Sequence, residues 1–279
     1  MSNQSGSEGL SLKGFASVSH GAEVSSYISA LESFDRLEQL QELKALGHER
    51  AGINAGARVL DVGCGFGLET LRLARLAAPG GLVAGCDLSS DFLAEAGRRA
   101  SAAKVDIAFE QARVEALPYP NQSFGIVWSE RLLIYVPDVT QAASEMRRVL
   151  RAGGHVACIE PDISTSTLNL ADRSLVRRVM GNEADTNVAH GWLPGQLSGI
   201  LKNVGFSDIR LATRVVVFSP ELAAGYFTEC GRSAAADHVI SDSELQDWNS
   251  GIETLFREDR HRPDISCSPL RSSGLVADI

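Results

Sequence analysis

The residues with the clearest chemical purpose are an acid and three alternate glycines behind a short apolar run. Residues 58–67 read Arg-Val-Leu-Asp-Val-Gly-Cys-Gly-Phe-Gly, and the apolar positions predict a short buried strand. From Leu68 onward the pattern predicts a helix. Glycines at such a turn let backbone approach a ligand closely, because a residue without a Cβ atom tolerates both the approach and a positive φ. The segment therefore predicts a loop that cradles a cofactor.

The spacing of these residues excludes two common nucleotide loops. A dinucleotide fingerprint has the pattern G-x-G-x-x-G, and Leu68 stands where its third glycine would be. A P-loop continues with Lys and Ser or Thr, and neither follows here. Asp61 would repel the phosphates of a pyrophosphate, and it suits a ligand with an ammonium group. A nicotinamide oxidoreductase is therefore disfavoured.

A second acid follows at the distance expected for a nucleoside site. Residues 82–87 predict a strand that ends in Asp87, twenty residues after Gly67. In a β-α-β unit this position places a carboxylate beside the ribose hydroxyls of an adenosine ligand. The alternative is that Asp87 or Ser89 only caps a helix over 90–103.

Composition narrows the class of protein. The 279 residues include 44% hydrophobic and 22% charged residues, as in ordinary globular proteins with a sizeable core. A net charge of -9 argues against sequence-independent binding of nucleic acid, so we expect a small-molecule partner. The five cysteines are scattered without C-x-x-C spacing, which predicts neither a disulfide framework nor a metal site. No apolar run approaches the length of a membrane span and residues 1–9 are no signal peptide, so we expect a cytoplasmic protein.

Helices and strands alternate around these motifs. Residues 23–50 predict helix with a break near 33–35, before the first strand. The remaining predicted strands are 105–110, 124–129, 155–162 and 209–218, and the remaining predicted helices are 68–77, 138–150, 194–204, 220–232 and 242–256. Such alternation predicts an α/β fold in which a mostly parallel sheet has helices on both faces and binds ligands at its carboxyl edge.

Three motifs carry a family resemblance. The run 59–67 resembles motif I of the class I S-adenosylmethionine (SAM) dependent methyltransferases. Residues 111–124 resemble the G-D-A-E-x-L-P-F-x-x-x-S-F segment of the small-molecule branch that includes the ubiquinone and menaquinone biosynthesis methyltransferases. Residues 129–138 resemble the segment after the fourth strand, and the whole resemblance covers about 57–218.

The sequence departs from the family pattern at two positions that are expected to contact the adenine of the cofactor. Ala112 replaces the usual glycine, and Arg113 stands where an aspartate in the family accepts a hydrogen bond from the adenine amino group. An arginine cannot accept that bond, so its side chain either stacks on the ring or points away.

The resemblance implies a Rossmann-like class I methyltransferase fold with N-terminal helices and a C-terminal helical substrate cap. Its implied divisions are a disordered or lid segment 1–22, helices 23–52, a SAM-binding core 53–162, and a remainder with substrate-cap insertion 163–260. Where relatives end in an apolar seventh strand, residues 261–279 are polar and predict an irregular tail. The implied residues that bind the SAM cofactor are Asp61, Gly63, Cys64, Gly65, Gly67, Asp87, Leu88, Ala112, Arg113, Ser129 and Arg131.

The implied activity is methyl transfer from SAM to oxygen, nitrogen or carbon of a small, partly apolar metabolite, by a monomer or homodimer. Such a displacement depends mainly on positioning, with a base only where the nucleophile carries a proton. The candidate bases are His190, Glu160, Glu130 and Tyr27. The alternative is a SAM-binding protein that does not methylate, either cyclase-like or regulatory.

Overall fold

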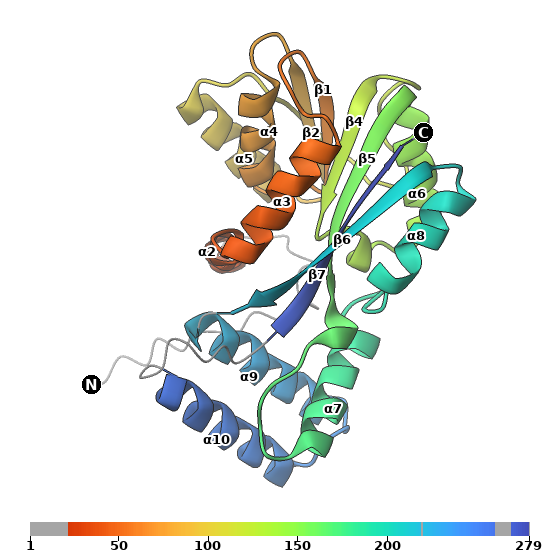
Figure 1. Ribbon diagram of the computed structural model, residues 1–279. Helices are drawn as coiled ribbons and strands as arrows, with labels where there is room; N and C mark the ends of the chain where they lie inside the picture. The colour runs from red at the N-terminus through yellow and green to blue at the C-terminus, as the bar shows by residue number, and fades with distance from the viewer. Residues whose placement is uncertain (1–21, 219, 260–268, 279) are drawn as a thin grey trace.

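A seven-stranded sheet in the order β3-β2-β1-β4-β5-β7-β6 forms the centre of the protein (Figure 1). The structure is a computed structural model that describes residues 22–218, 220–259 and 269–278. The strands are β1 (Arg58–Val62), β2 (Leu82–Asp87), β3 (Ala108–Gln111), β4 (Phe124–Glu130), β5 (Leu150–Asp162), β6 (Ser207–Val217) and β7 (Pro269–Asp278). Strands β1 to β5 are parallel, and β7 runs antiparallel to both of its neighbours. The predicted mostly parallel, doubly wound sheet is confirmed.

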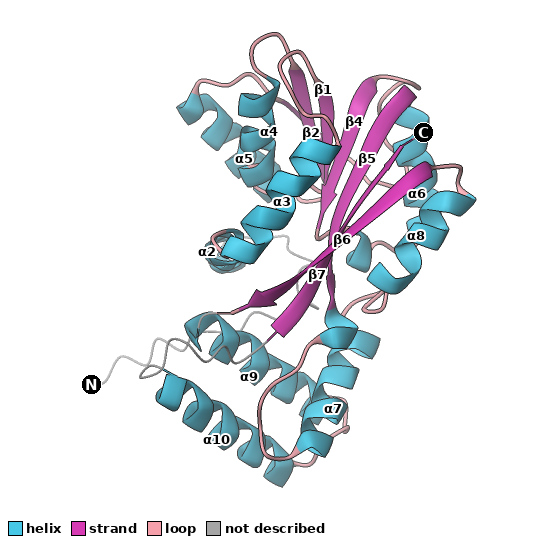
Figure 2. Cartoon of the chain, in the orientation of Figure 1, coloured by secondary structure: helices cyan, strands magenta, loops and turns pink. Residues whose placement is uncertain are grey.

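Helices cover both faces of the sheet (Figure 2). On one face lie α3 (Glu38–Arg50) and α4 (Leu68–Ala77), preceded by α2 (Ala22–Asp35) and followed by α5 (Ser90–Ala103). On the other face lie α6 (Val139–Val149) and α8 (Pro194–Asn203). The helix break predicted near residues 33–35 is confirmed, because α2 ends at Asp35 and α3 begins at Glu38.

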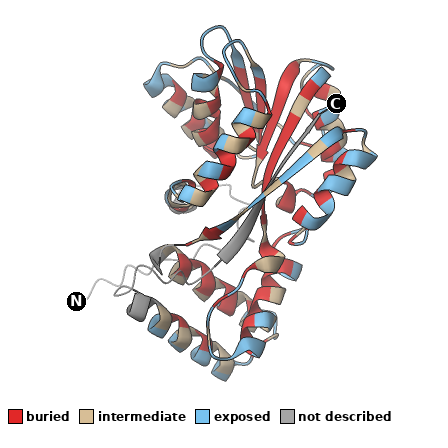
Figure 3. Cartoon of the chain, viewed as in Figure 1, coloured by how far each residue is buried: buried red, intermediate tan, exposed pale blue. Residues whose placement is uncertain are grey.

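Side chains that alternate along the central strands pack into two hydrophobic cores, one on each face of the sheet. Val59, Ile126 and Ile159 pack with α3 and α4, whereas Leu60 and Val127 pack with the opposite layer. This alternation follows from the two-residue period of a strand, and it explains why β1 is apolar on both faces. Figure 3 shows the buried residues gathered in these central strands, with more exposed positions along β6.

A helical cap lies beyond the carboxyl edge of the sheet. It contains α7 (Arg173–Asn182), α9 (Pro220–Ala236) and α10 (Asp242–Asp259), and α9 contacts both of the others. Two short helical turns, η1 (Leu133–Tyr135) after β4 and η2 (Ile163–Thr165) after β5, lie between the sheet and the cap, and the π-helical turn η3 (Glu183–Asn187) extends α7. Among the described residues, no helix is both long and apolar enough to cross a membrane.

The prediction of an irregular tail is wrong for residues 269–278. These residues form β7, which inserts between β5 and β6 and pairs with both. A strand paired on both edges gains main-chain hydrogen bonds whatever its side-chain pattern, and Pro269 stands at the first strand position, where a missing N–H is tolerated. The predictions for residues 1–21 and 260–268 lie outside the described residues.

Several other boundaries differ from prediction, and among the strands the largest shifts are at β5 and β3. Strand β5 begins at Leu150 rather than His155, because residues 150–154 join the strand across a register shift against β4. Strand β3 spans 108–111 rather than 105–110. Neither shift changes the order of the strands, so the carboxyl ends of β1, β2 and β4 still meet where a ligand is expected.

Candidate active site

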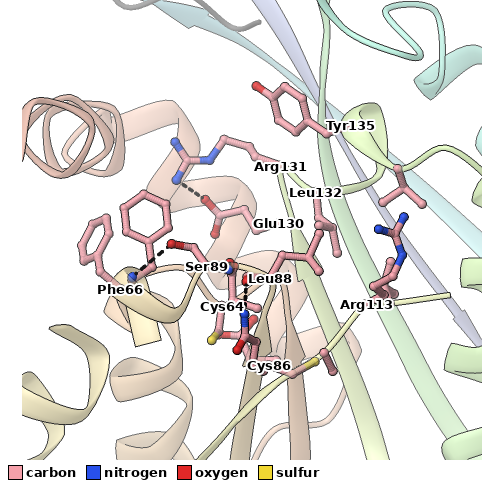
Figure 4. A pocket seen from close by; sticks show the side chains of 18 of the residues that line it. Cys64, Phe66, Cys86, Leu88, Ser89, Arg113, Glu130, Arg131, Leu132 and Tyr135 are labelled. Atoms are coloured by element: carbon pink, nitrogen blue, oxygen red, sulfur yellow. Dashed lines mark hydrogen bonds and ion pairs between the residues drawn. The ribbon is translucent and has the colours of Figure 1, made fainter. Parts of the chain in front are cut away.

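A cavity of about 680 Å³ opens at the carboxyl ends of β1, β2 and β4 (Figure 4). This volume lies in the range of small-molecule and cofactor sites. Its walls come from the glycine loop after β1, the turns after β2 and β3, and the segment between β4 and η1. The position agrees with the prediction that ligands bind at this edge of the sheet.

The glycine loop needs its glycines for two different reasons. Gly63, Gly65 and Gly67 all have positive φ, at 69°, 52° and 80°. A Cβ atom at Gly63 would lie 2.8 Å from the side chain of Leu132, so this glycine lets the loop and a cavity wall approach each other. A Cβ atom at Gly67 would lie 3.0 Å from Ala96, so that glycine serves the packing of α4 against α5. Gly63 and Cys64 line the cavity, whereas Gly65 and Gly67 shape the loop behind it.

Asp61 lies under this loop at the end of β1. It is almost fully buried, lines the cavity, and accepts a hydrogen bond of 2.6 Å from the Thr70 hydroxyl. Burial raises the pKa of Asp61 well above its usual value, against the effect of the Thr70 bond. The carboxyl group is therefore a buried acceptor whose charged form would be favoured by a cation in the cavity.

Asp87 joins the glycine loop to the turn after β2. Its Oδ2 accepts from the amide of Gly65 and its Oδ1 from the amide of Ser89, each at 2.9 Å, and it lines the cavity. Burial raises the pKa of Asp87, against the hydrogen bonds from Ser89 and Gly65. The helix cap of α5 is Ser89, whose hydroxyl accepts from the amide of Phe92 at 3.2 Å. Of the two cap candidates, the structure thus selects Ser89.

A buried ion cluster forms the wall nearest α3, and its central residue, Lys44, was not predicted from the sequence. The Lys44 Nζ lies 2.7 Å from Glu130 Oε2, 2.5 Å from Asp35 Oδ1 and 3.1 Å from Glu69 Oε2, and its side chain is 2% exposed. Burial lowers the pKa of Lys44, but Glu130 and Glu69 outweigh burial and raise it. Lys44, Glu69 and Glu130 all line the cavity, so charges of both signs face it there.

Arg131 adds a second cation to this wall. Its Nη2 lies 2.9 Å from Glu130 Oε1, and its backbone has a positive φ of 52° while its amide donates to the Ile159 carbonyl at 2.8 Å. The buried Arg131 Nε makes no hydrogen bond within the described part of the chain. A buried donor of this kind, at a cavity wall, points to a ligand acceptor.

The opposite end of the cavity is lined by residues after β2 and β3. Leu88 is 53% exposed there, and Ala112 donates its amide to the Asp87 carbonyl at 3.0 Å. The Arg113 Nη2 lies 3.0 Å from Glu115 Oε1, and both residues line the cavity. The Arg113 guanidinium is held by Glu115 at the edge of the cavity, and the two alternatives for its role toward adenine stay predictions.

The structure brings most of the predicted cofactor residues together. Those that line the cavity are Asp61, Gly63, Cys64, Asp87, Leu88, Ala112, Arg113 and Arg131. Ser129 does not line it, because the residue is fully buried within β4.

Of the four candidate bases, only Glu130 lines the cavity, and it is shared by Lys44 and Arg131. Glu160 is fully buried and its Oε1 accepts from the amides of Leu132 and Leu133, at 3.2 and 2.9 Å, so it holds the start of η1. Burial raises the pKa of Glu160 to about 7, against those backbone hydrogen bonds.

The other two candidate bases also lie outside the cavity lining. The His190 Nε2 contacts the Val136 carbonyl at 2.9 Å, which fixes the loop after η1. Tyr27 packs against the cluster of Phe66 and Phe92. In the described residues no group of His, Cys, Asp and Glu side chains could hold a metal ion.

The strand order and the glycine loop define the Rossmann-like fold of the class I SAM-dependent methyltransferases. Residues 60–158 match the family model described as "Methyltransferase domain", so this part of the chain is a methyltransferase domain of the SAM-dependent type.

The curated relatives include methyltransferases of the predicted small-molecule branch. The chain is 37% identical over 135 residues to a 27-O-demethylrifamycin SV methyltransferase of Amycolatopsis mediterranei, covering 48% of this chain and 44% of that protein. It is 35% identical over 151 residues to a ubiquinone/menaquinone biosynthesis C-methyltransferase of Hahella chejuensis, covering 51% and 59%. The chain therefore spans about half the length of the curated relatives it matches. Among solved structures, the [4+2]-cyclase SpnF is similar with a TM-score of 0.53 and 22% identity, over 86% of this chain and 80% of that one, which shows the fold alone.

Proposed function

We propose that this protein transfers the methyl group of SAM to a small, partly apolar acceptor. The observation that carries the proposal is one cavity along which the strand order places the paired charges after β4, Asp87 at the end of β2 and Arg113 after β3. A zwitterionic amino acid, a ribose and a purine need this order of groups. SAM supplies the electrophilic methyl group on its sulfonium.

The charged wall is suited to the amino acid end of the cofactor. Glu130 and Asp61 are acceptors for an ammonium group, while the unpaired Nε of Arg131 is a donor for a carboxylate. Lys44 supports this wall through Glu130, because its three N–H donors already face Glu130, Asp35 and Glu69. Asp87 retains acceptor capacity for the ribose hydroxyls beyond its two backbone bonds, because a carboxylate has about four acceptor positions.

The acceptor side is apolar. Leu132, Tyr135, Val136 and Pro137 line the cavity beside Arg131. We assign to them the exclusion of water and the alignment of the acceptor with the methyl group, which are the main contributions that a protein makes to such a displacement. Glu130 fits a positioning role here, because two cations already share its carboxylate.

The experiment is to incubate the protein with methyl-labelled SAM and a bacterial metabolite extract, and to follow label in small molecules together with formation of S-adenosylhomocysteine (SAH). We expect label transfer, and a melting temperature raised by SAM and SAH but not by NAD. Stabilisation by NAD alone would overturn the proposal.

A second candidate is a SAM-binding protein that does not methylate. The similarity in fold to a cyclase favours it, since that fold houses more than one chemistry. Stabilisation by SAM with no label transfer to any acceptor tested, and with turnover of an unlabelled substrate, would support this second candidate.

A further inference from the structure

The base end of the cavity presents a donor and an acceptor side by side. Strand β3 is the outermost strand beyond β2, and the turn that follows β3 is tied back to β2 by the bond from the Ala112 amide to the Asp87 carbonyl. A nucleoside whose ribose lies at Asp87 therefore meets Arg113 and Glu115 with its base. Figure 4 shows Arg113 on the side of the cavity away from Phe66.

The pair leaves hydrogen-bonding capacity for a ligand. One Nη2–Oε1 contact of 3.0 Å joins Arg113 to Glu115. A guanidinium has five N–H donors and a carboxylate two acceptor oxygens, so one contact uses a small part of what the pair offers. The Arg113 side chain is 53% exposed and the Glu115 side chain 15%, and both border the cavity, so a base is able to reach them.

The two common purine edges present opposite patterns to this pair. Adenine offers an amino donor at C6 and an acceptor at N1, whereas hypoxanthine offers an oxygen acceptor at C6 and an N–H donor at N1. A lone carboxylate can only accept, so it selects the 6-amino edge. A guanidinium next to a carboxylate has a partner for each atom of either edge.

We propose that the Arg113–Glu115 pair reads the base and makes this site accept a 6-oxo purine nucleoside as readily as the 6-amino form. The inference rests on the proposed function, because it assumes that the cavity holds a SAM-type nucleoside. Arg113 is thus the residue that sets base selectivity, and replacing it by an acid converts the pair into an acceptor-only surface that discriminates against the 6-oxo group.

The test compares SAH with its 6-oxo analogue, S-inosylhomocysteine, by calorimetric titration. The wild-type protein should bind the two within about three-fold of each other. Arg113→Asp should prefer SAH by roughly 5- to 150-fold, the discrimination that one well-formed pair of hydrogen bonds gives between bases. The matched control is Arg178→Asp, which removes an ion pair with Glu244 in the cap and should leave the ratio of affinities unchanged.

The outcomes separate the two proposals. A wild-type preference for SAH above ten-fold, or an Arg113→Asp variant with the wild-type ratio, overturns the role of Arg113 while the cofactor remains SAM. Failure of the wild-type protein to bind either ligand overturns the proposed function instead. If Arg113→Asp does not fold, Arg113→Leu replaces it, because it also removes the donor to the 6-oxo group and should prefer SAH at least five-fold.

Discussion

Replacing Asp87 by asparagine should damage both the cofactor site and the unliganded fold, by separable amounts. In the wild-type protein, one carboxylate oxygen accepts from Gly65 and the other from Ser89, each at 2.9 Å. Asparagine keeps one oxygen and places an NH₂ group against the second amide. The variant therefore loses one hydrogen bond to a charged acceptor, and we expect the free energy of unfolding to fall by about 1.5–3 kcal/mol.

The effect on the ligand comes from the charge. A neutral amide has one acceptor oxygen, which a backbone amide already uses, so the ribose hydroxyls lose a charged partner. A loss of about 1.5–3 kcal/mol corresponds to a roughly 10- to 100-fold weaker affinity for SAM.

The assay is calorimetric titration with SAM beside a urea melt of the same variant. The control is Asp138→Ala, which removes the helix cap that accepts from the Gln141 amide at 2.9 Å, outside the cavity. Its stability should fall by about 0.5–2 kcal/mol with unchanged binding. An Asp87→Asn variant that behaves like this control, less stable but with wild-type affinity, would refute the ribose assignment.

Two further predictions concern buried charges. Lys44→Met should lower the free energy of unfolding by about 3–5 kcal/mol in a urea melt, because Asp35, Glu69 and Glu130 lose a shared cation; a loss no larger than that of the exposed Lys202→Met, about 0.5 kcal/mol or less, would contradict the role of the cluster. Glu160, with a pKa raised to about 7 from 4.5, binds more protons in the folded state than in the unfolded state, so it lowers stability as pH rises through that window. Glu160→Gln should remove up to about 3 kcal/mol of this pH dependence between pH 5 and 8, as measured by urea melts across that range. If the free energy of unfolding of the variant changes with pH as much as that of the wild-type protein, another group causes the dependence.

The sequence predicted the first five strands because their cues are local. Each buried strand is an apolar run that ends at an acid or a turn, and positive φ at Gly63 and Gly67 is a requirement that glycine meets by itself. Strand β7 is different, since its ladders depend on the register of β5 and β6 and not on its own polar pattern.

The sequence predicted site residues where the spacing of a motif places them in the loop that faces the cavity. It did not predict site residues that lie outside such motifs. Lys44 lies among charged residues of α3 and has the sequence context of a surface lysine, yet it pairs with Glu69 and Glu130, 25 and 86 residues away. Glu160 and His190 lie near the carboxyl edge of the sheet, where ligands are expected, but their side chains bind the backbone around η1. Proximity to a strand end therefore does not say whether a polar side chain faces ligand or backbone.

During synthesis, strands β5 and β6 lack their shared neighbour in the sheet until β7 is made. Strand β7 begins 52 residues after β6 ends and then fills the space between the two. At about 5–20 residues per second, the nascent chain spends roughly 3–10 s with both inner edges open. Open strand edges are templates for pairing with other chains, and Leu211 and Val215 of β6 are exposed apolar residues even in the folded protein. Chains halted before residue 269 should therefore be substrates for chaperones and proteases, and codons that slow translation of 218–268 should lower the yield of folded protein even though the cofactor loop is complete long before.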